Sequence, residues 1–305
     1  MAACLACQEP GPDETGYHPR CARALFGTKR PPQVEADSRR ITELGLEMIR
    51  HTTLSGVQQK LSMSLVGGRL IVTTAGLEAT HVLKPPSSIF AHLPENEAVS
   101  MRVMALARVA VPPSGLVRTA DGKLAYVVRR FDRPGIPRKL ALEDFCQLAQ
   151  LPPKDKYQGS LEQCAQLVRR HTGEPIVQLS RFYRMALANW WVGNEDLHRK
   201  NLGLLRTASG HIELAPAYDV VCSRLYLDRQ DLALPVNGKD RNLRLRDWQK
   251  FGAYCGLPPR AVERTVQSVV AVKDRAVQLV VDSYLPADLK RQYIALLEDR
   301  TAQLA

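Results

Sequence analysis

The residues best suited to chemistry lie in one polar stretch, Gly193 to Asn201. Within it Asp196 is followed five residues later by Asn201, and an apolar run, Leu202 to Leu205, comes next. A carboxylate in such a loop can accept or orient a hydroxyl proton, and a carboxamide oxygen can bind a metal ion. An Asp and an Asn at this spacing, just before a strand, are typical of a kinase catalytic loop.

A second acidic residue, Asp219, lies 18 residues beyond Asn201, after a segment (202–214) that we expect to form a short hairpin. In kinase-like folds an Asp at this place binds Mg²⁺, which prefers oxygen ligands and keeps several waters. Asp219 taken alone could equally be a turn residue after Pro216. Paired with the loop before it, Asp219 is predicted to share a Mg²⁺ ion with Asn201.

Two features in the first half of the chain could contact phosphate. Lys84 ends an apolar run (81–83), and Glu97 at the start of the next helix could hold its ammonium group in place. The loop 52–62 is small and polar, so its backbone N–H groups could cradle phosphates, with Lys60 adding charge. This loop has neither Walker A spacing nor the G-x-G-x-x-G pattern of ordinary protein kinases.

The N-terminus carries a separate set of metal-type residues: Cys4, Cys7, His18 and Cys21. A close pair of cysteines followed by a His and a Cys suits a tetrahedral structural Zn²⁺. The alternative is a zinc-free loop in which these residues merely pack. A closed site of this kind predicts no catalysis, although a zinc knuckle can also bind nucleic acid or a partner protein.

The elements expected around these residues form an α+β fold, with a small β-rich lobe before a larger helical lobe. Strands are predicted near 61–65, 70–72, 81–84, 116–118 and 124–130, and a first long helix over about 94–106. Later helices are predicted over 141–151, 160–172, 178–193, 259–283 and 286–304, interrupted by two short strands at 202–206 and 211–214. We predict a division into a head (1–30), an N-lobe (31–139) and a C-lobe (140–305).

The composition excludes several classes of protein but does not indicate a particular function. Of the residues, 45% are apolar and 24% charged, as in ordinary globular proteins, and no stretch approaches the roughly 20 apolar residues of a membrane span. Seven cysteines, an odd number, argue against a disulfide framework, and we expect a cytoplasmic protein. The net charge of +11 attracts anionic partners or simply aids solubility. The basic run 241–246 could be solvated surface or a contact for a protein substrate or a DNA-bound partner, and residues 154–157 could be a substrate contact.

Beyond these separate features, the order and spacing of several motifs resemble the HipA family over about residues 50–300, and in particular the short HipT-type kinases of tripartite HipBST systems. The motifs are Ser55-Gly56-Val57-Gln58-Gln59-Lys60-Leu61-Ser62, Leu83-Lys84-Pro85-Pro86, Leu93-Pro94-Glu95-Asn96-Glu97, Arg130-Phe131-Asp132-Arg133, Gly193 to Asn201, and Pro216-Ala217-Tyr218-Asp219. The resemblance implies a two-lobed, protein-kinase-like fold, and the Cys and His spacing adds a small zinc-knuckle-like head in front of it.

The resemblance also implies a role for each matching residue. Asp196 would be the catalytic base, and Asn201 and Asp219 would bind Mg²⁺. ATP would be bound by Ser55, Gly56, Val57, Gln58, Gln59, Lys60, Lys84, Arg129, Arg130, Phe131, His198, Lys200 and Tyr218, of which the residues 129–131 would border adenine. Autophosphorylation would fall on Thr53 or Ser55.

By the same resemblance, the protein would be a serine/threonine-protein kinase toxin that phosphorylates an aminoacyl-tRNA synthetase. Its partners would be a HipB-like DNA-binding antitoxin and a HipS-like small protein, with DNA reached only through the antitoxin and no membrane. One alternative is a kinase-like regulatory scaffold, bound to antitoxin and DNA, with little catalysis. Another is a small-molecule kinase. The joint presence of Asp196, Asn201, Asp219 and Lys84 favours an active protein kinase.

Overall fold

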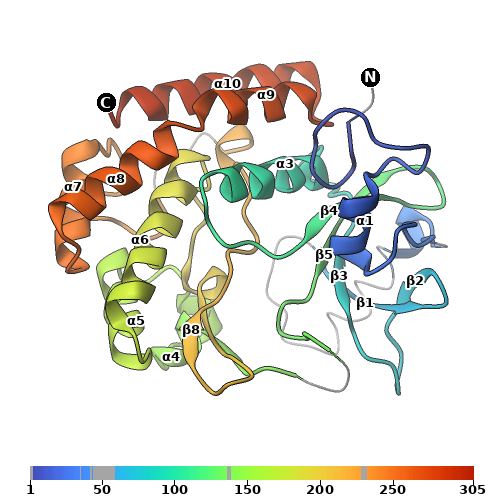
Figure 1. The fold of residues 1–305 in the computed structure, drawn as a ribbon, viewed down its shortest axis with the longest axis horizontal. Coiled ribbons are helices and arrows are strands. Elements are labelled where there is room, and N and C mark those ends of the chain that lie inside the picture. The colour runs from blue at the N-terminus through green and yellow to red at the C-terminus, as the bar shows by residue number, and fades with distance from the viewer. Residues whose placement is uncertain (1–2, 35, 42, 44–58, 136–138, 228–231) are drawn as a thin grey trace. The chain divides into compact units, whose positions relative to one another are not determined.

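The chain forms two compact units in the computed structural model, which describes residues 3–34, 36–41, 43, 59–135, 139–227 and 232–305 (Figure 1). Unit 1 comprises Met1–Arg102, Pro112–Lys139 and Leu279–Pro286. Unit 2 comprises Val103–Val111, Leu140–Gln278 and Ala287–Ala305. The head, the N-lobe and the C-lobe expected from the sequence remain a proposed division.

Unit 1 is built on an antiparallel sheet of five strands in the order β2-β1-β3-β5-β4. The strands are β1 (Leu61–Val66), β2 (Arg69–Val72), β3 (His81–Lys84), β4 (Ser114–Arg118) and β5 (Leu124–Arg129). Leu61 and Met63 are buried on one face of β1, as their alternation with serines predicts. Gly67 and Gly68 turn the chain into β2 with φ of 56° and 77°, a conformation that strongly favours glycine. All five strands were predicted near these positions.

Helix α3 (Leu93–Leu106) follows the sheet strands β1 to β3 in the chain, as predicted. Its first turn contains Pro94, whose fixed φ suits a helix start, and Glu95, whose charge complements the helix dipole. The helix thereby presents Glu97 one turn from its start. Residues 40–50, whose apolar residues have helical spacing, fall mostly outside the described residues.

The N-terminal head packs directly on the edge strand of this sheet. Its helix α1 (Pro19–Phe26) ends at Gly27, and the backbone N–H of Leu116 in β4 donates to the Leu5 carbonyl at 2.8 Å. A Cβ added at Gly115 would lie 2.7 Å from Ala6 Cα, so only glycine lets the head approach this closely. The head is therefore an integral part of unit 1.

Unit 2 is mainly helical around an aromatic core. Its main helices are α5 (Leu161–His171), α6 (Pro175–Trp191), α7 (Leu245–Tyr254), α8 (Pro259–Val270) and α10 (Ala287–Ala302); α9 (Lys273–Asp282) begins in this unit. Trp191, Trp248, Tyr183, Phe182 and Phe251 are fully buried between them. A three-stranded sheet, β6 (Leu142–Asp144), β7 (Gly203–Arg206) and β8 (Ile212–Leu214), has β7 at its centre. The Gly193–Asn201 loop joins α6 to β7, the position that the sequence predicted.

Two predictions about unit 2 were wrong in detail, and one helix was missed. The helix expected over 141–151 is instead strand β6 followed by the short helix α4 (Phe145–Leu148), because β6 pairs with β7 some 60 residues away (Leu142 opposite Leu205). The single helix expected over 259–283 is broken between α8 and α9. Helix α7 was missed, because residues 241–246 were interpreted only as a basic run. No helix in the described part of the chain is long and apolar enough to cross a membrane.

Candidate active site and candidate metal centre

The loop after α6 is held by hydrogen bonds from its own helix. The buried Asn194 donates from Nδ2 to Asn189 Oδ1 at 2.7 Å, and its Oδ1 accepts from the Asp196 backbone N–H at 3.3 Å. At Gly193 (φ 75°) an added Cβ would lie 2.4 Å from Leu296 Cδ2 of α10. The sequence therefore needs a glycine and two side-chain amides to shape the backbone that carries Asp196.

A buried ion pair supports the same loop from the C-terminal helix. Arg300 of α10 donates to Glu195 Oε1 at 3.0 Å and to the Trp190 carbonyl at 3.0 Å. The Glu195 backbone N–H donates to Ser223 Oγ at 2.9 Å. Burial lowers the pKa of Arg300, whereas the Glu195 carboxylate opposes that shift. Residues more than 100 positions away thus fix the residue next to Asp196.

Asp196 is the one side chain of residues 193–199 that the loop does not bury. Half of it is exposed, whereas its neighbours on both sides are buried. The Tyr157 hydroxyl donates to its Oδ1 at 3.0 Å, and His198 Nε2 lies 3.9 Å from its Oδ2. A carboxylate that is oriented yet open to solvent has the geometry that a general base needs.

Asn201 and Asp219 each show features expected of metal-binding oxygens. The Asn201 Nδ2 donates to the Asp196 carbonyl at 3.4 Å, so its Oδ1 remains the group that a cation would meet. Asp219 has φ of 57°, a left-handed conformation that costs energy for most residues and is tolerated best by Asp and Asn. Its carboxylate acts electrostatically on His198, which places the two groups in one neighbourhood.

The surroundings of His198, beside Asp196, favour its neutral form. Burial lowers its pKa, the charge of Lys156 lowers it further, and the carboxylates of Asp196 and Asp219 oppose the shift. Lys156 Nζ lies 2.9 Å from His198 Nε2, and because an ammonium group can only donate, Nε2 accepts and Nδ1 carries the proton. That buried Nδ1 has no hydrogen-bond partner among the residues that the structure describes.

Lys200 and Tyr218 also meet in unit 2. Lys200 Nζ lies 3.3 Å from Asp144 Oδ2, and the Tyr218 hydroxyl donates to the Lys200 carbonyl at 3.1 Å. Burial raises the pKa of Tyr218, so its hydroxyl stays protonated. The predicted residues Asp196, His198, Lys200, Asn201, Tyr218 and Asp219 all lie in this unit.

In unit 1, Lys84 and Glu97 form the expected pair. Their Nζ and Oε1 atoms are 2.5 Å apart, and both side chains are at most 3% exposed. The Tyr126 ring lies 5.4 Å from the same ammonium group. A charge this well enclosed and paired is held in one direction, as a phosphate-binding lysine must be.

The remaining predicted ATP residues are described only in part. Gln59 and Lys60 are half-buried. Arg130 forms a two-bond pair with Asp132 at 2.9 and 2.6 Å, and Arg129 donates to the Ala24 carbonyl of the head at 3.3 Å. The phosphate-loop residues Ser55, Gly56, Val57 and Gln58, and the autophosphorylation candidates Thr53 and Ser55, lie outside the described residues. The nucleotide role of all these residues stays a prediction.

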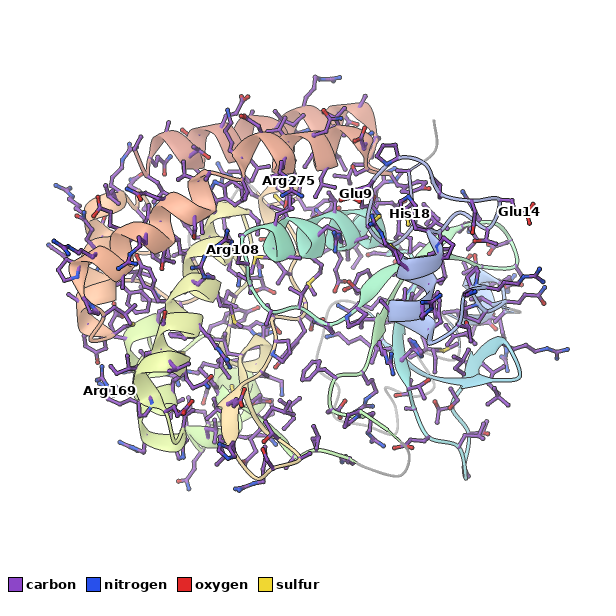
Figure 2. All side chains as sticks on the ribbon, in the orientation of Figure 1. Glu9, Glu14, His18, Arg108, Arg169 and Arg275 are labelled. Atoms are coloured by element: carbon purple, nitrogen blue, oxygen red, sulfur yellow. The ribbon has the colours of Figure 1, made fainter. Side chains whose placement is uncertain are left out.

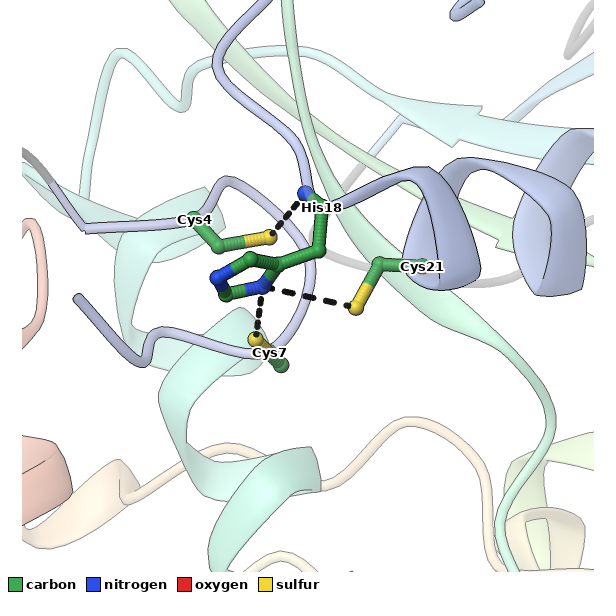
Figure 3. A group of neighbouring side chains, drawn as sticks. All are labelled: Cys4, Cys7, His18 and Cys21. Atoms are coloured by element: carbon green, nitrogen blue, oxygen red, sulfur yellow. Dashed lines mark hydrogen bonds between the residues drawn. The ribbon is translucent and has the colours of Figure 1, made fainter. Parts of the chain in front are cut away.

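The N-terminal cysteines and histidine converge on one point (Figure 3). The ligand atoms of Cys4, Cys7, His18 and Cys21 all lie within 4.8 Å of one another, and Cys7 Sγ is 3.2 Å from His18 Nδ1. Hydrogen bonding to the sulfurs of Cys21 and Cys7 lowers the pKa of Cys4. Figure 2 shows His18 and Glu9 on this head.

His18 is oriented as a metal-bound histidine would be. Its Nε2 lies 3.2 Å from the Pro10 carbonyl, which can only accept a hydrogen bond, so Nε2–H donates and the Nδ1 lone pair faces the sulfurs. In a tetrahedral zinc site with bonds of 2.0–2.3 Å, neighbouring ligand atoms are about 3.3–3.8 Å apart. The four residues therefore fit Zn²⁺ in number and type, and their ligand atoms cluster within 4.8 Å of one another.

Comparison with known proteins identifies the class of fold. The fold is that of HipA-type kinases: the HipA chain of the Shewanella oneidensis HipA, HipB and operator DNA complex matches with a TM-score of 0.72 at 22% identity, over 88% of this chain and 71% of that one. The Helicobacter pylori proinflammatory kinase CtkA matches with a TM-score of 0.57 at 16% identity, over 81% of this chain and 90% of that one.

The sequence itself belongs to the family described as HipA-like C-terminal domain, which matches residues 52–277. A candidate kinase of Sinorhizobium fredii, Y4mE, is 32% identical over 75% of this chain and 57% of its own. The serine/threonine-protein kinase toxin HipA of Shewanella oneidensis is 27% identical over 61% of this chain and 46% of its own. This chain thus spans about half the length of these two relatives.

Sequence reasoning missed the residues that support the loop. Arg300, Ser223 and Asp144 gave no signal, because each acts through a contact distant in sequence. Lys156 and Tyr157 were noted only as a possible substrate contact. A lysine and a tyrosine after two prolines indicated a functional segment, but they did not indicate contact with Asp196.

Proposed function

We propose that this protein is a Mg²⁺- and ATP-dependent serine/threonine kinase. The observation that carries the proposal is the loop 193–201, which presents an oriented, half-exposed Asp196 and turns the Asn201 amide so that its oxygen is available. The enclosed Lys84–Glu97 pair supports the same reading from unit 1. A chain that served only as a scaffold would not need all of these groups.

Each residue has a distinct task in this mechanism. Asp196 accepts the proton of the acceptor hydroxyl, while Lys84 donates to phosphate oxygens and His198 would lie close to the γ-phosphate. Asn201 and Asp219 would hold Mg²⁺, which when bound neutralises charge on the phosphates. Because phosphoryl transfer depends mainly on positioning and electrostatics, the buried supports of the loop are as important as the groups they hold.

We further propose that the kinase is the toxin of a toxin–antitoxin system. The resemblance to HipA, one of whose solved structures contains HipB and operator DNA, supports a HipB-like antitoxin partner. A HipS-like small protein and an aminoacyl-tRNA synthetase substrate complete the proposal. Autophosphorylation on Thr53 or Ser55 would add a charge of about −2 to the phosphate loop and so lower ATP affinity.

The head is proposed to bind a structural Zn²⁺ ion through Cys4, Cys7, His18 and Cys21. Four ligands fill a tetrahedral site and leave no open position for substrate, so the ion would stabilise the fold rather than take part in the reaction. Its place against β4 makes it part of the sheet's support.

Growth and labelling experiments test the kinase proposal together. Expression of the wild-type chain is expected to arrest growth, and the Asp196→Gln variant is expected not to. In a bacterial lysate with γ-labelled ATP, label is expected on a protein of synthetase size. Equal growth arrest by both forms would contradict a kinase mechanism, and label on small molecules alone would instead indicate a small-molecule kinase.

A further inference from the structure

A tyrosine hydroxyl lies on the carboxylate that we assign as the catalytic base. Tyr157 donates to Asp196 Oδ1 at 3.0 Å, across 39 residues of sequence. Its ring stands edge-on to His198 with centroids 5.3 Å apart, and Lys156 Nζ is 4.8 Å from the centre of the same ring. Oδ2, the second carboxylate oxygen, lies 3.9 Å from His198 Nε2, beyond hydrogen-bond distance.

The backbone beneath Tyr157 is fastened to the catalytic loop on both sides of the tyrosine. The Arg199 backbone N–H donates to the Lys156 carbonyl at 3.1 Å, and Arg199 Nε donates to the Gln158 carbonyl at 2.6 Å. At Gly159, with φ of 97°, an added Cβ would lie 2.2 Å from the Arg199 guanidinium. This segment is therefore a fixed part of the loop's surroundings and not a lid that must swing away.

We propose that Tyr157 is a positioning residue for phosphoryl transfer, because its hydroxyl holds Oδ1 of Asp196 and thereby presents Oδ2 to the acceptor hydroxyl. The tyrosine keeps its proton throughout. The acceptor proton passes to Oδ2 as the acceptor oxygen forms its bond to the γ-phosphorus and the bond to ADP breaks. This role deepens the proposed kinase function and depends on it.

The geometry favours this role over contact with the substrate. A hydroxyl that bound the substrate would point into solvent, whereas the hydroxyl of Tyr157 is committed to Asp196 although about half of the residue is exposed. Tyr157 and His198 both face the Asp196 carboxylate, and Lys156 faces His198. Removal of the Tyr157 hydroxyl leaves the carboxylate free to rotate without removing any group that touches ATP.

The test compares Tyr157→Phe with Tyr254→Phe. Tyr254 is also an exposed tyrosine, and its hydroxyl accepts a hydrogen bond from Gln166 rather than from the catalytic loop. Label transfer from γ-labelled ATP to dephosphorylated casein is measured at varied ATP. Tyr157→Phe is expected to lower kcat about tenfold, as for loss of a hydrogen bond to a charged group. The KM for ATP is expected to stay within about twofold, since uniform binding is untouched. Tyr254→Phe is expected to match wild type.

A double variant separates a positioning role from a general loss of structure. In an Asp196→Asn background, Tyr157→Phe is expected to have no further effect on the residual rate, because the group through which it acts is gone. An undiminished kcat in Tyr157→Phe, or a full tenfold loss in the Asp196→Asn background, would overturn the proposal. Absence of transfer by the wild-type chain would instead contradict the kinase function itself.

Discussion

Asp196 and Asp219 are the same type of residue in two different surroundings. This difference in surroundings suits them to different roles. Asp196 is oriented by Tyr157 and open to solvent, which suits proton acceptance. Asp219 sits in a left-handed backbone conformation and acts on His198, which suits a fixed charge beside a bound ion.

Replacement of each aspartate by asparagine should therefore have different effects. Asp196→Asn is expected to lower kcat by about 10²–10⁴ and to leave the affinity for Mg²⁺-ATP nearly unchanged, because it removes a general base. Asp219→Asn is expected to weaken binding of Mg²⁺-ATP relative to metal-free ATP. Titration calorimetry with and without Mg²⁺, beside rate measurements, checks both. Equal losses of Mg²⁺-ATP affinity in the two variants would contradict the separate roles.

At this scale the sequence indicated the proposed catalytic and metal-binding residues but not the residues that support them. The five-residue spacing of Asp196 and Asn201 is local, so a pattern can show it. Tyr157 lies 39 residues from Asp196 and meets it only because the backbone of Lys156 and Gln158 bonds to Arg199. No spacing rule predicts such a contact.

At the scale of elements, the loop is supported from α10 by the Glu195–Arg300 pair. The Arg300→Met variant is expected to lower the free energy of unfolding by about 3 kcal/mol, because it leaves a buried carboxylate without its partner. The double variant Arg300→Met with Glu195→Met is expected to recover most of that loss. Urea unfolding of the four forms measures both values. Additive losses in the double variant would show that the pair is not coupled.

The stability of the N-terminal head should depend on bound Zn²⁺. Purified wild type is expected to contain about one Zn²⁺ per chain, and Cys7→Ser is expected to lose it, whereas Cys146→Ala in unit 2 is expected to keep it. A chelator is expected to lower Tm by at least about 5 °C, because binding energy at such a site stabilises the folded state. Metal analysis that finds under about 0.2 Zn²⁺ per chain would contradict the site.

Elements with strong local signals were predictable, and elements defined by distant pairing were not. Gly67 and Gly68 between alternating residues indicated the β1–β2 hairpin, and the apolar period indicated α5 and α6. Strand β6 is three residues long and exists because Leu142 to Asp144 pair with β7. Its own residues favour a helix equally well, so the sequence misassigned it.

At the scale of the whole molecule, stability should depend on pH through buried histidines. His81 is 2% exposed, with Nε2 lying 2.9 Å from the Leu25 carbonyl of the head. Burial lowers its pKa from 6.5, Arg129 lowers it further, and the Leu25 carbonyl opposes the shift. Below pH 6.5 the unfolded chain therefore binds a proton that the folded chain does not. Stability is lost as the pH falls through this range.

The His81→Gln variant should show a weaker dependence on pH. Wild type is expected to lose up to about 1.4 kcal/mol per pH unit through this histidine below pH 6.5, and the variant to lack that contribution. Urea unfolding at pH 7.5 and 5.5 gives the difference. The pKa of His198 is also lowered, but His198 is present in both proteins, so its contribution to the pH dependence cancels in the comparison. Identical slopes would contradict the account.

The central claim is that one Mg²⁺ ion is shared by Asn201 and Asp219 on a bound triphosphate. A crystal structure with Mg²⁺ and a non-hydrolysable ATP analogue tests it most directly. We expect the Asn201 Oδ1 and an Asp219 carboxylate oxygen at about 2.1 Å from the same ion, with Asp196 free of metal. An analogue bound with its ion held by neither residue would contradict the claim.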